Sequence, residues 1–410
     1  MNAPPTTYDP GLALTGGRIV LSDSITETQA LLVDAGRITG IVNTNSVPES
    51  YVQVDVGGRY ITPGLIDLHI HGTLNYSFNQ ATSESWSTIL EANAAHGVTA
   101  LLPTIATDSL DQLEACLCFG RDWMLAAPPG GSQILGIHLE GPFFAPEYAG
   151  AQNPLYLRLP DETAIARLLA YAGILKIVSF APELPGALNL TAQLHELGII
   201  AAAGHSAATD HDVQAAIELG LSHAIHLWSG QSTTQRIGPW RVPGLLETVL
   251  SSDELTAEMI CDNRHLPGTL MKLAVRALGV DRLCAISDAT NGAGLPDGAR
   301  FNFAGLDCEV HDGVAMLPDH TSFAGSTTLL NQMIPVLTEV VGLTLPEALR
   351  MASLTPAQIL GIAQRKGSLA VGKDADIAVF NADFTTWRVL IGGKWVFQTT
   401  DLILPKAKTF

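Results

Sequence analysis

The sequence has 410 residues, of which 47% are hydrophobic and 15% charged, with 38 glycines and 23 prolines. This composition is typical of a compact α/β protein with many short loops, and the length favours one large domain plus a smaller one. The formal net charge of -18, with no long basic stretch, argues against binding to nucleic acid or to an anionic membrane surface. An anionic substrate would therefore need a local cationic pocket.

The five cysteines are scattered along the chain, which favours free thiols over a disulfide framework. The first ten residues, MNAPPTTYDP, have neither the basic nor the apolar region of a signal peptide. No apolar run reaches the roughly 18 residues that a transmembrane helix needs. We therefore expect a cytoplasmic protein without membrane association.

Short alternating strands interrupted by glycine are predicted near both ends of the chain. They occur in LALTGGRIVL, ALLVDAGRITGIV and VQVDVGGRYITP, and again in GSLAVGKDADIAVFNADFTTWRVLIGGKWVFQ. Because chain termini often lie close together, the two segments predict one small β-sandwich domain, residues 1–62 and 366–410, after a disordered start.

Between residues 63 and 365, short apolar strands alternate with helical stretches, which indicates βα units and a parallel sheet. The eight predicted strands are 64–72, 98–107, 135–143, 175–183, 198–206, 221–229, 255–263 and 281–290. Eight such units predict an α/β fold of the (β/α)8, or TIM, barrel type. A hairpin insertion over 301–319 and two closing helices, 331–342 and 345–361, are expected to follow.

Histidines and carboxylates stand at the ends of these strands. They are His69, His71, Glu140, His205, His226 and Asp288. The chemistry of such barrels sits at the C-terminal ends of the strands, and alternate strand residues face the same side, so His69 and His71 are both expected to point into the barrel mouth. Imidazole nitrogens and carboxylate oxygens are the ligands that a borderline divalent ion such as zinc prefers. The pattern predicts a metal centre.

The remaining histidines have simpler interpretations. His138 lies one layer deeper on the strand that carries Glu140 and is interpreted as a hydrogen-bonded structural residue. Four others are interpreted as solvated or capping residues of helices and their turns: His96, His195, His211 and His223.

Several motifs occur in a consistent order from about residue 12 to about residue 395: PGLIDLHIHG, HLEGPFFAPEYAGAQNP, FAPE, AAGHSAAT, AIHLW, ISDAT and GSLAVGKDADIAV. In this order they resemble the amidohydrolase superfamily and, within it, the N-acetylglucosamine-6-phosphate deacetylase family. The resemblance implies a barrel beside a small β-sandwich. It also implies hydrolysis of the acetamide of a 6-phosphorylated amino sugar, giving acetate and the amino sugar phosphate.

The resemblance also implies a divalent metal cofactor, with zinc expected first, iron, manganese or cobalt as alternatives, and one or two ions per subunit. By motif position, Glu140, His205 and His226 are similar to the ligands of the principal metal. His69 and His71 match the pair found in members that hold a second metal.

Asp288 matches the catalytic aspartate of the family. An amide resists attack by water, so the reaction needs a group that takes a proton from the attacking water and another proton for the departing amine. We expect Asp288 to accept the first proton and to deliver it to the sugar nitrogen.

Substrate-binding residues are implied less directly. The family usually follows the sixth-strand histidine with Asn-Ala-Met, whereas this chain has Leu227, Trp228, Ser229, Gly230 and Gln231. The backbone donors of Ser229 and Gly230 remain candidates for the phosphate, although the asparagine side chain is lost. Trp228 is open to two interpretations, a core residue or a platform for a sugar ring.

Three more residues match substrate contacts of the family. Arg241 matches an arginine that reaches the substrate phosphate of a neighbouring subunit, which also implies a homodimer. The segment before it departs from the family pattern, so an ordinary surface arginine stays an alternative. His265 matches a phosphate-binding histidine, and Gln152 stands where members carry a residue near the sugar hydroxyls.

Two other functions remain open. One is an amidohydrolase that acts on a different or unphosphorylated N-acyl amino sugar. The other is a non-catalytic barrel that serves as a scaffold, although a chain that had lost activity would be expected to lose ligands, and this chain keeps all six strand-end residues.

Overall fold

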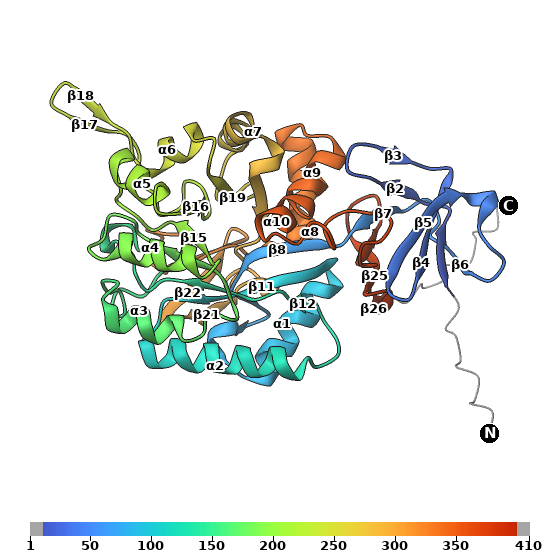
Figure 1. The fold of residues 1–410 in the computed structure, drawn as a ribbon, viewed down its shortest axis with the longest axis horizontal. Coiled ribbons are helices and arrows are strands. Elements are labelled where there is room, and N and C mark those ends of the chain that lie inside the picture. Colours follow the sequence, from blue (N-terminus) through green and yellow to red (C-terminus); the bar gives the residue numbers. More distant parts are fainter. Residues whose placement is uncertain (1–10, 400–410) are drawn as a thin grey trace.

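The computed structural model describes residues 11–399, which form a large barrel with a smaller two-sheet unit beside it (Figure 1). The disordered start that the sequence predicts, residues 1–10, lies outside the described residues. The same holds for the end of the predicted sandwich segment, residues 400–410.

Eight parallel strands form the barrel. Their order is β8 (Leu65–Ile70), β11 (Val98–Ala106), β13 (Ile137–Glu140), β14 (Leu175–Phe180), β15 (Ile200–Ala203), β16 (Leu221–Ala224), β19 (Thr256–Ile260) and β20 (Leu283–Ile286). The ring closes just beyond β20, where the Asp288 amide donates to the His69 carbonyl and the His71 amide to the Ala289 carbonyl, each at 2.8 Å. The predicted barrel is confirmed. Its strands are shorter than predicted because the polar residues after them turn into loops.

Helices follow the barrel strands and cover the outside of the ring (Figure 1). They are α1 (Ser83–Ala95), α2 (Leu110–Ala126), α3 (Glu162–Leu169), α4 (Ala187–Glu196), α5 (Asp210–Ile217), α6 (Leu245–Ser251) and α7 (Gly268–Arg282). Side-chain caps start several of them: Thr82 accepts from the Ser85 amide before α1, and Asp161 accepts from the Ala164 amide before α3.

The closing helices differ in part from the prediction. The first comprises α8 (Leu330–Val336) and a π-helical turn, η4 (Leu337–Val341). The second is not one helix but two, α9 (Leu345–Met351) and α10 (Leu354–Ile359). The break has a physical reason: Pro356 has no amide to donate to the Ala352 carbonyl, which instead accepts a 2.9 Å hydrogen bond from Ile66 of β8.

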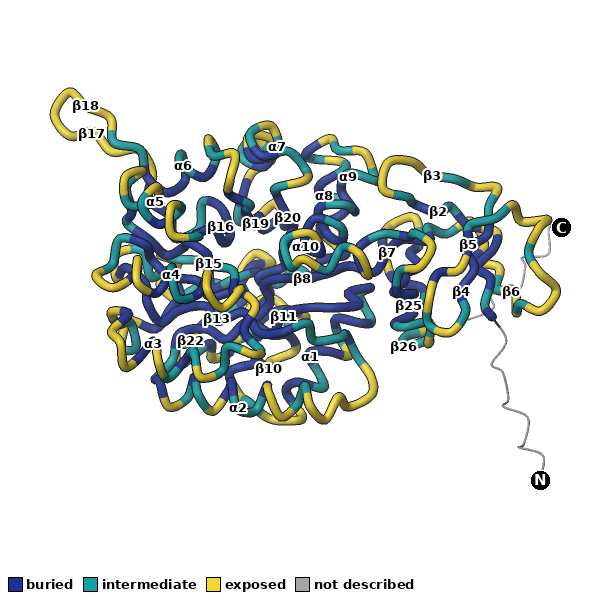
Figure 2. The backbone as a smooth tube through the Cα atoms, viewed as in Figure 1, coloured by how far each residue is buried: buried dark blue, intermediate teal, exposed yellow. Residues whose placement is uncertain are grey.

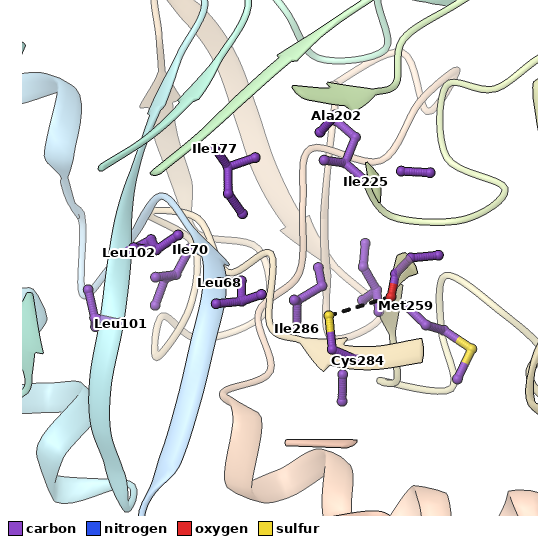
Figure 3. Packing of buried hydrophobic residues seen from close by; sticks show 14 of the residues in the cluster. Leu68, Ile70, Leu101, Leu102, Ile177, Ala202, Ile225, Met259, Cys284 and Ile286 are labelled. Atoms are coloured by element: carbon purple, nitrogen blue, oxygen red, sulfur yellow. Dashed lines mark hydrogen bonds between the residues drawn. The ribbon is translucent and has the colours of Figure 1, made fainter. Parts of the chain in front are cut away.

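A single apolar core fills the barrel and the space between its strands and helices (Figure 2). Figure 3 shows part of it, with Leu68 and Ile70 from β8, Ile177 from β14 and Ile286 from β20. The five cysteines are free, as expected, and four of them are buried. The barrel is therefore a packed support for the residues at its rim rather than a pore.

Two sheets form the smaller unit. One has the order β5 (Arg37–Asn43), β4 (Gln29–Asp34), β1 (Leu12–Thr15), β6 (Val52–Asp55). The other has the order β26 (Lys394–Gln398), β25 (Thr386–Ile391), β24 (Ile377–Phe380), β7 (Tyr60–Pro63), β2 (Arg18–Val20), β3 (Ile25–Thr26). Segments from both ends of the chain thus share one sheet, as the sequence suggests, while the exact domain boundaries stay a prediction. Only Gly64 separates β7 from β8.

Two smaller additions border the open end of the barrel. The predicted hairpin insertion is a three-stranded antiparallel sheet, β21 (Arg300–Phe303), β22 (Leu306–His311) and β23 (Val314–Met316). A hairpin of β17 (Gln235–Ile237) and β18 (Trp240–Val242) projects from the barrel beyond α5 and α6, and its residues are mostly exposed (Figures 1 and 2).

The short remaining elements connect these parts. They are the strands β9 (Gly72–Thr73), β10 (Tyr76–Ser77) and β12 (Gln133–Ile134), and the 3-10 turns η1 (Thr44–Ser46), η2 (Phe78–Gln80) and η3 (Pro146–Tyr148). Across residues 11–399, none of the helices combines the length and the apolar character that a membrane span requires.

Candidate metal centre and substrate cavity

The structure brings all six strand-end residues together at the open end of the barrel. Glu140 lies at the middle of the group: its Oε1 atom is 3.0 Å from His226 Nε2, 3.3 Å from His205 Nε2 and 3.5 Å from His69 Nε2. Its Oε2 atom is 3.3 Å from His71 Nε2. Residues far apart in the sequence therefore present their donor atoms to one small volume.

Asp288 completes the group from the side of β20. Its Oδ1 atom is 3.3 Å from His71 Nε2 and 3.5 Å from His69 Nε2. The two imidazole Nε2 atoms of His69 and His71 are themselves 3.3 Å apart. Two overlapping sets of three donors result, His69 with His71 and Asp288, and His69 with Glu140 and His226.

The outer nitrogen of each histidine fixes the orientation of its ring. The Nδ1 atoms of His71, His205 and His226 lie 3.2, 2.8 and 3.1 Å from the carbonyl oxygens of Thr104, Tyr148 and Ser229. A carbonyl only accepts, so each Nδ1 carries the proton. The Nε2 atom of each ring is therefore the nitrogen that faces the group.

These observations fit a divalent metal ion. Metal–nitrogen bonds of about 2.0–2.1 Å put neighbouring donors around a tetrahedral ion roughly 3.3 Å apart, which is close to the separations found here. Imidazole nitrogens and carboxylate oxygens also face one another at these distances, so positive charge at the centre stabilises the group. Imidazole with carboxylate is a donor set that borderline ions such as zinc favour.

The pKa shifts of His69 and Asp288 also indicate that positive charge stabilises this group of residues. Burial alone would lower the pKa of His69, but the attraction of Glu258, Glu140 and Asp288 raises it well above its usual value. Burial alone would raise the pKa of Asp288, but the positive charge of His69 and a hydrogen bond from His71 lower it. In the absence of a cation, a proton on the imidazoles balances the carboxylates, and an ion would replace that proton.

Three residues of the group hold strained backbone. The φ angles of His205, His226 and Asp288 are 44°, 20° and 46°, in the left-handed region that residues with a Cβ rarely adopt. Such strain costs about 1–3 kcal/mol per residue and persists where the surroundings impose it, as at functional sites.

Sequence reasoning missed Glu258, a fully buried carboxylate on β19. Its Oε2 atom accepts a 2.8 Å hydrogen bond from His69 Nδ1, and its Oε1 atom is 3.4 Å from His223 Nε2. A signal was available, since a glutamate inside the apolar run LTAEMIC needs a partner when buried. Glu258 orients His69 as the backbone carbonyls orient the other three histidines.

The interpretation of His223 as solvated or capping was wrong. It lies on β16, is fully buried, and its Nδ1 atom is 2.7 Å from Thr256 Oγ1. His138 agrees with its structural interpretation: its nitrogens are 3.1 Å from the Leu68 carbonyl and 2.6 Å from Ser179 Oγ. Burial, followed by repulsion from His69, lowers the pKa of His138 to about 3, so its ring stays neutral.

A cavity of about 360 Å³ opens above the group. Among the residues implied in substrate binding, Gln152, Ser229, Gly230 and His265 line it, together with Trp228. The ring of His265 is held by Asp262, whose Oδ2 atom is 2.7 Å from its Nδ1 atom, and lies against Phe323. No lysine or arginine of the described residues lines this cavity.

Two implied substrate residues have other contacts. Gln152 Nε2 donates to Glu140 Oε2 at 2.6 Å, and its Oε1 atom accepts from the Thr107 amide at 3.0 Å, so this side chain supports Glu140. Arg241 does not line the cavity: it stands exposed on the projecting β17–β18 hairpin, with its Nη1 atom 3.2 Å from the Pro239 carbonyl.

Comparisons with known proteins agree with this architecture. Residues 60–396 match the model of the Amidohydrolase family. The N-acetylglucosamine-6-phosphate deacetylase of Bacillus subtilis (strain 168) is 32% identical over 371 residues, which cover 89% of this chain and 92% of that protein. The N-acetylgalactosamine-6-phosphate deacetylase of Escherichia coli O157:H7 is 29% identical and covers 93% of this chain and 98% of its own length.

The solved structures show the same likeness. The crystal structure of N-acetylglucosamine-6-phosphate deacetylase from Pasteurella multocida superposes with a TM-score of 0.87 at 30% identity, covering 94% of this chain and 99% of that chain. The family model, the relatives and the fold agree over nearly the whole described chain. The chain is therefore a member of the amidohydrolase family.

Proposed function

We propose that this amidohydrolase removes the acetyl group from N-acetylglucosamine 6-phosphate, or from a closely related N-acetyl amino sugar phosphate, to give acetate and the amino sugar phosphate. The observation that carries the proposal is the convergence of four imidazoles and two carboxylates beneath the 360 Å³ cavity, which all of them except His69 line. The similarity to curated deacetylases over most of the chain supports this choice of substrate class.

We propose Glu140, His205 and His226 as the principal metal ligands, with His69 and His71 able to hold a second ion. Zinc is proposed first, and iron, manganese or cobalt would suit the same donors. A bound divalent ion would lower the pKa of water to about 7 and polarise the acetyl carbonyl.

Asp288 is the proposed acid and base. Its lowered pKa keeps it a carboxylate at neutral pH, so it is able to accept a proton. Its place at the floor of the cavity lets it take that proton from the attacking water and pass it to the sugar nitrogen as the C–N bond breaks. The amine then departs neutral rather than as an anion.

The substrate phosphate needs hydrogen-bond donors, and among the described residues no lysine or arginine of the same subunit lines the cavity. The proposed contacts are the backbone amides of Ser229 and Gly230 and the side chain of His265, which line the cavity. We propose that Arg241 adds its charge across the interface of a homodimer, which its place on an exposed, projecting hairpin would allow. The cytoplasmic location stays a prediction of the sequence.

The test is a substrate panel on metal-loaded protein with acetate release as the readout. The panel contains N-acetylglucosamine 6-phosphate, its galactosamine isomer and unphosphorylated N-acetylglucosamine. The isomer is included because Trp228, Ser229 and Gly230 replace the usual motif and because one relative at 29% identity is named for it. Rapid release from either phosphate supports the proposal. Turnover of the unphosphorylated sugar alone would overturn the phosphate assignment.

Asp288→Asn is the matched variant for the mechanism. It keeps the shape of the side chain and removes the proton acceptor, so turnover should fall by at least about 100-fold, the lower range for general acid–base catalysis, while the metal content stays. Nearly full activity in a well-folded Asp288→Asn protein would contradict the role given to Asp288.

A further inference from the structure

A second group of metal-binding side chains lies outside the buried centre, on the three-stranded insertion. Glu309 and His311 alternate along β22, so their side chains leave the same face of the sheet. His320 reaches them from the loop that follows β23. The ligand atoms of the three residues all lie within 4.8 Å of one another.

Hydrogen bonding explains only part of this group. His320 Nε2 lies 2.9 Å from Glu309 Oε1, which accounts for those two side chains. The ring of His311 stands 4.6 Å from the ring of His320, although both side chains are nearly half exposed, at 47% and 46%, and free to point into water. A cation shared by the two imidazoles would account for their contact.

The framework under the group is ordered. β22 is the central strand of its sheet, where Glu309 pairs with both Arg300 and Met316. The loop is closed on itself, because the His320 amide donates to the Leu317 carbonyl at 2.9 Å. His320 itself has a φ angle of 57°, and its side chain reaches back to Glu309 on the strand. Three donors on fixed backbone lose little entropy when they bind an ion.

The local charge also favours a cation. The Arg300 Nε atom stands 3.8 Å from Glu309 Oε2, but the Arg300 side chain is 82% exposed. Arg300 therefore competes only weakly with a metal ion for the Glu309 carboxylate. Asp312 places a further carboxylate 3.8 Å from His311 Nε2. Two imidazoles with one carboxylate are a ligand set found in zinc enzymes, and the order of affinities for such donors favours copper, nickel and zinc over manganese.

We propose that Glu309, His311 and His320 bind one borderline divalent cation of the zinc, nickel or copper class at the rim of the cavity. The site is separate from the buried centre and does not depend on the proposed hydrolysis. Its position matters because His320 and the residues after it, Thr321 to Phe323, line the cavity. A cation there ties the rim loop to β22 and fixes the wall that Phe323 forms against His265.

The experiment is a Zn²⁺ titration, by calorimetry, of tag-free protein whose buried centre has first been filled. The wild type should bind one further equivalent. His311→Ala should bind it at least about tenfold more weakly, because even residues that only orient a ligand are worth about 10- to 100-fold in metal affinity. His211→Ala is the matched control, since His211 is an exposed histidine on α5, and it should bind as the wild type does. Mg²⁺ should give no such signal, because it prefers oxygen ligands.

Hydrogen exchange gives a second readout. Zn²⁺ should slow amide exchange in residues 317–323 of the wild type and leave it unchanged in His311→Ala. Wild-type protein that binds no further equivalent would overturn the proposal. So would His311→Ala that binds Zn²⁺ as tightly as His211→Ala.

Discussion

Replacing Glu258 with glutamine tests whether the buried carboxylate behind His69 sets the affinity of the metal centre. Glutamine keeps the size of the side chain and an oxygen that accepts the hydrogen bond from His69 Nδ1. In the wild type this hydrogen bond joins His69 Nδ1 to Glu258 Oε2 at 2.8 Å. It removes the negative charge that makes the His69 ring a stronger ligand. Loss of such an outer partner typically weakens metal binding by about 10- to 100-fold, or about 1.4 to 2.8 kcal/mol.

The fold should tolerate this change. His223, the other partner of Glu258, is able to place its proton on Nδ1 toward Thr256 Oγ1 and to accept from the new amide through Nε2. A cavity or an unpaired buried charge, which would cost several kcal/mol, is therefore avoided. The effect should appear in metal retention rather than in folding.

The assay is metal content after dialysis against a series of chelator concentrations, with melting temperature measured in parallel. Glu258→Gln should release the ion held by His69 at a chelator concentration about 10- to 100-fold lower than the concentration that the wild type requires. Glu254→Gln, an exposed substitution in the segment just before β19, is the control and should match the wild type. Equal retention in Glu258→Gln and Glu254→Gln would refute the reasoning.

Three further outcomes are expected. Gly230→Ala should lower metal content and turnover, because the added Cβ would lie 2.6 Å from His205 Nδ1. Gly238→Ala is the control: Gly238 has nearly the same φ angle, but its added Cβ would have no neighbouring atom within 4 Å, so this variant shows the effect of backbone strain without the clash. Asp262→Asn should lower the melting temperature at pH 7. Burial alone would raise the pKa of Asp262, but the hydrogen bond from His265 lowers it below its usual value. The ionised carboxylate therefore stabilises the fold at a pH above its unfolded pKa of about 3.9. This stabilisation is lost as the pH falls below that value and through the lower pKa of the folded state. The difference from wild type should therefore shrink below about pH 4, and a constant difference would contradict the assignment. Chelation should abolish acetate release and lower the melting temperature, with recovery on adding Zn²⁺; full activity without metal would exclude a metal centre.

The barrel and the position of its polar rim could be predicted because both depend on local patterns. Short apolar runs between helices set the strands, and the residue after each run must lie at the C-terminal edge. His69 and His71 in PGLIDLHIHG illustrate this, since their spacing predicts that both side chains leave the same side of the chain, where β8 ends at Ile70. The convergence with Glu140 then follows from closing the ring.

What could not be predicted depends on contacts between distant segments. The sequence of β19 signals that Glu258 needs a partner, but it does not identify His223 and His69 as those partners, because they are brought to Glu258 only when the barrel strands pair. The break between α9 and α10 has a local cause in Pro356, but the partner that satisfies the Ala352 carbonyl, the Ile66 amide, comes from a distant strand. Arg241 matched a motif, but the altered segment before it, with Gly238 and Pro239 at the turn, forms a projecting hairpin that carries Arg241 away from the cavity of its own subunit.

The strand β7, which runs through Gly64 into the first barrel strand, has a consequence for how the protein is made. Its register partner on one side, β24, follows about three hundred residues later, with Phe380 opposite Tyr60. A ribosome that adds about 5–20 residues per second needs roughly 15 to 60 s to cover that interval. Until then one edge of β7 stays open to pairing with other chains. The six-stranded sheet of the smaller unit must therefore wait for its final strands, long after the last barrel strand, β20, has been made, and a holdase chaperone should protect β7 during this interval.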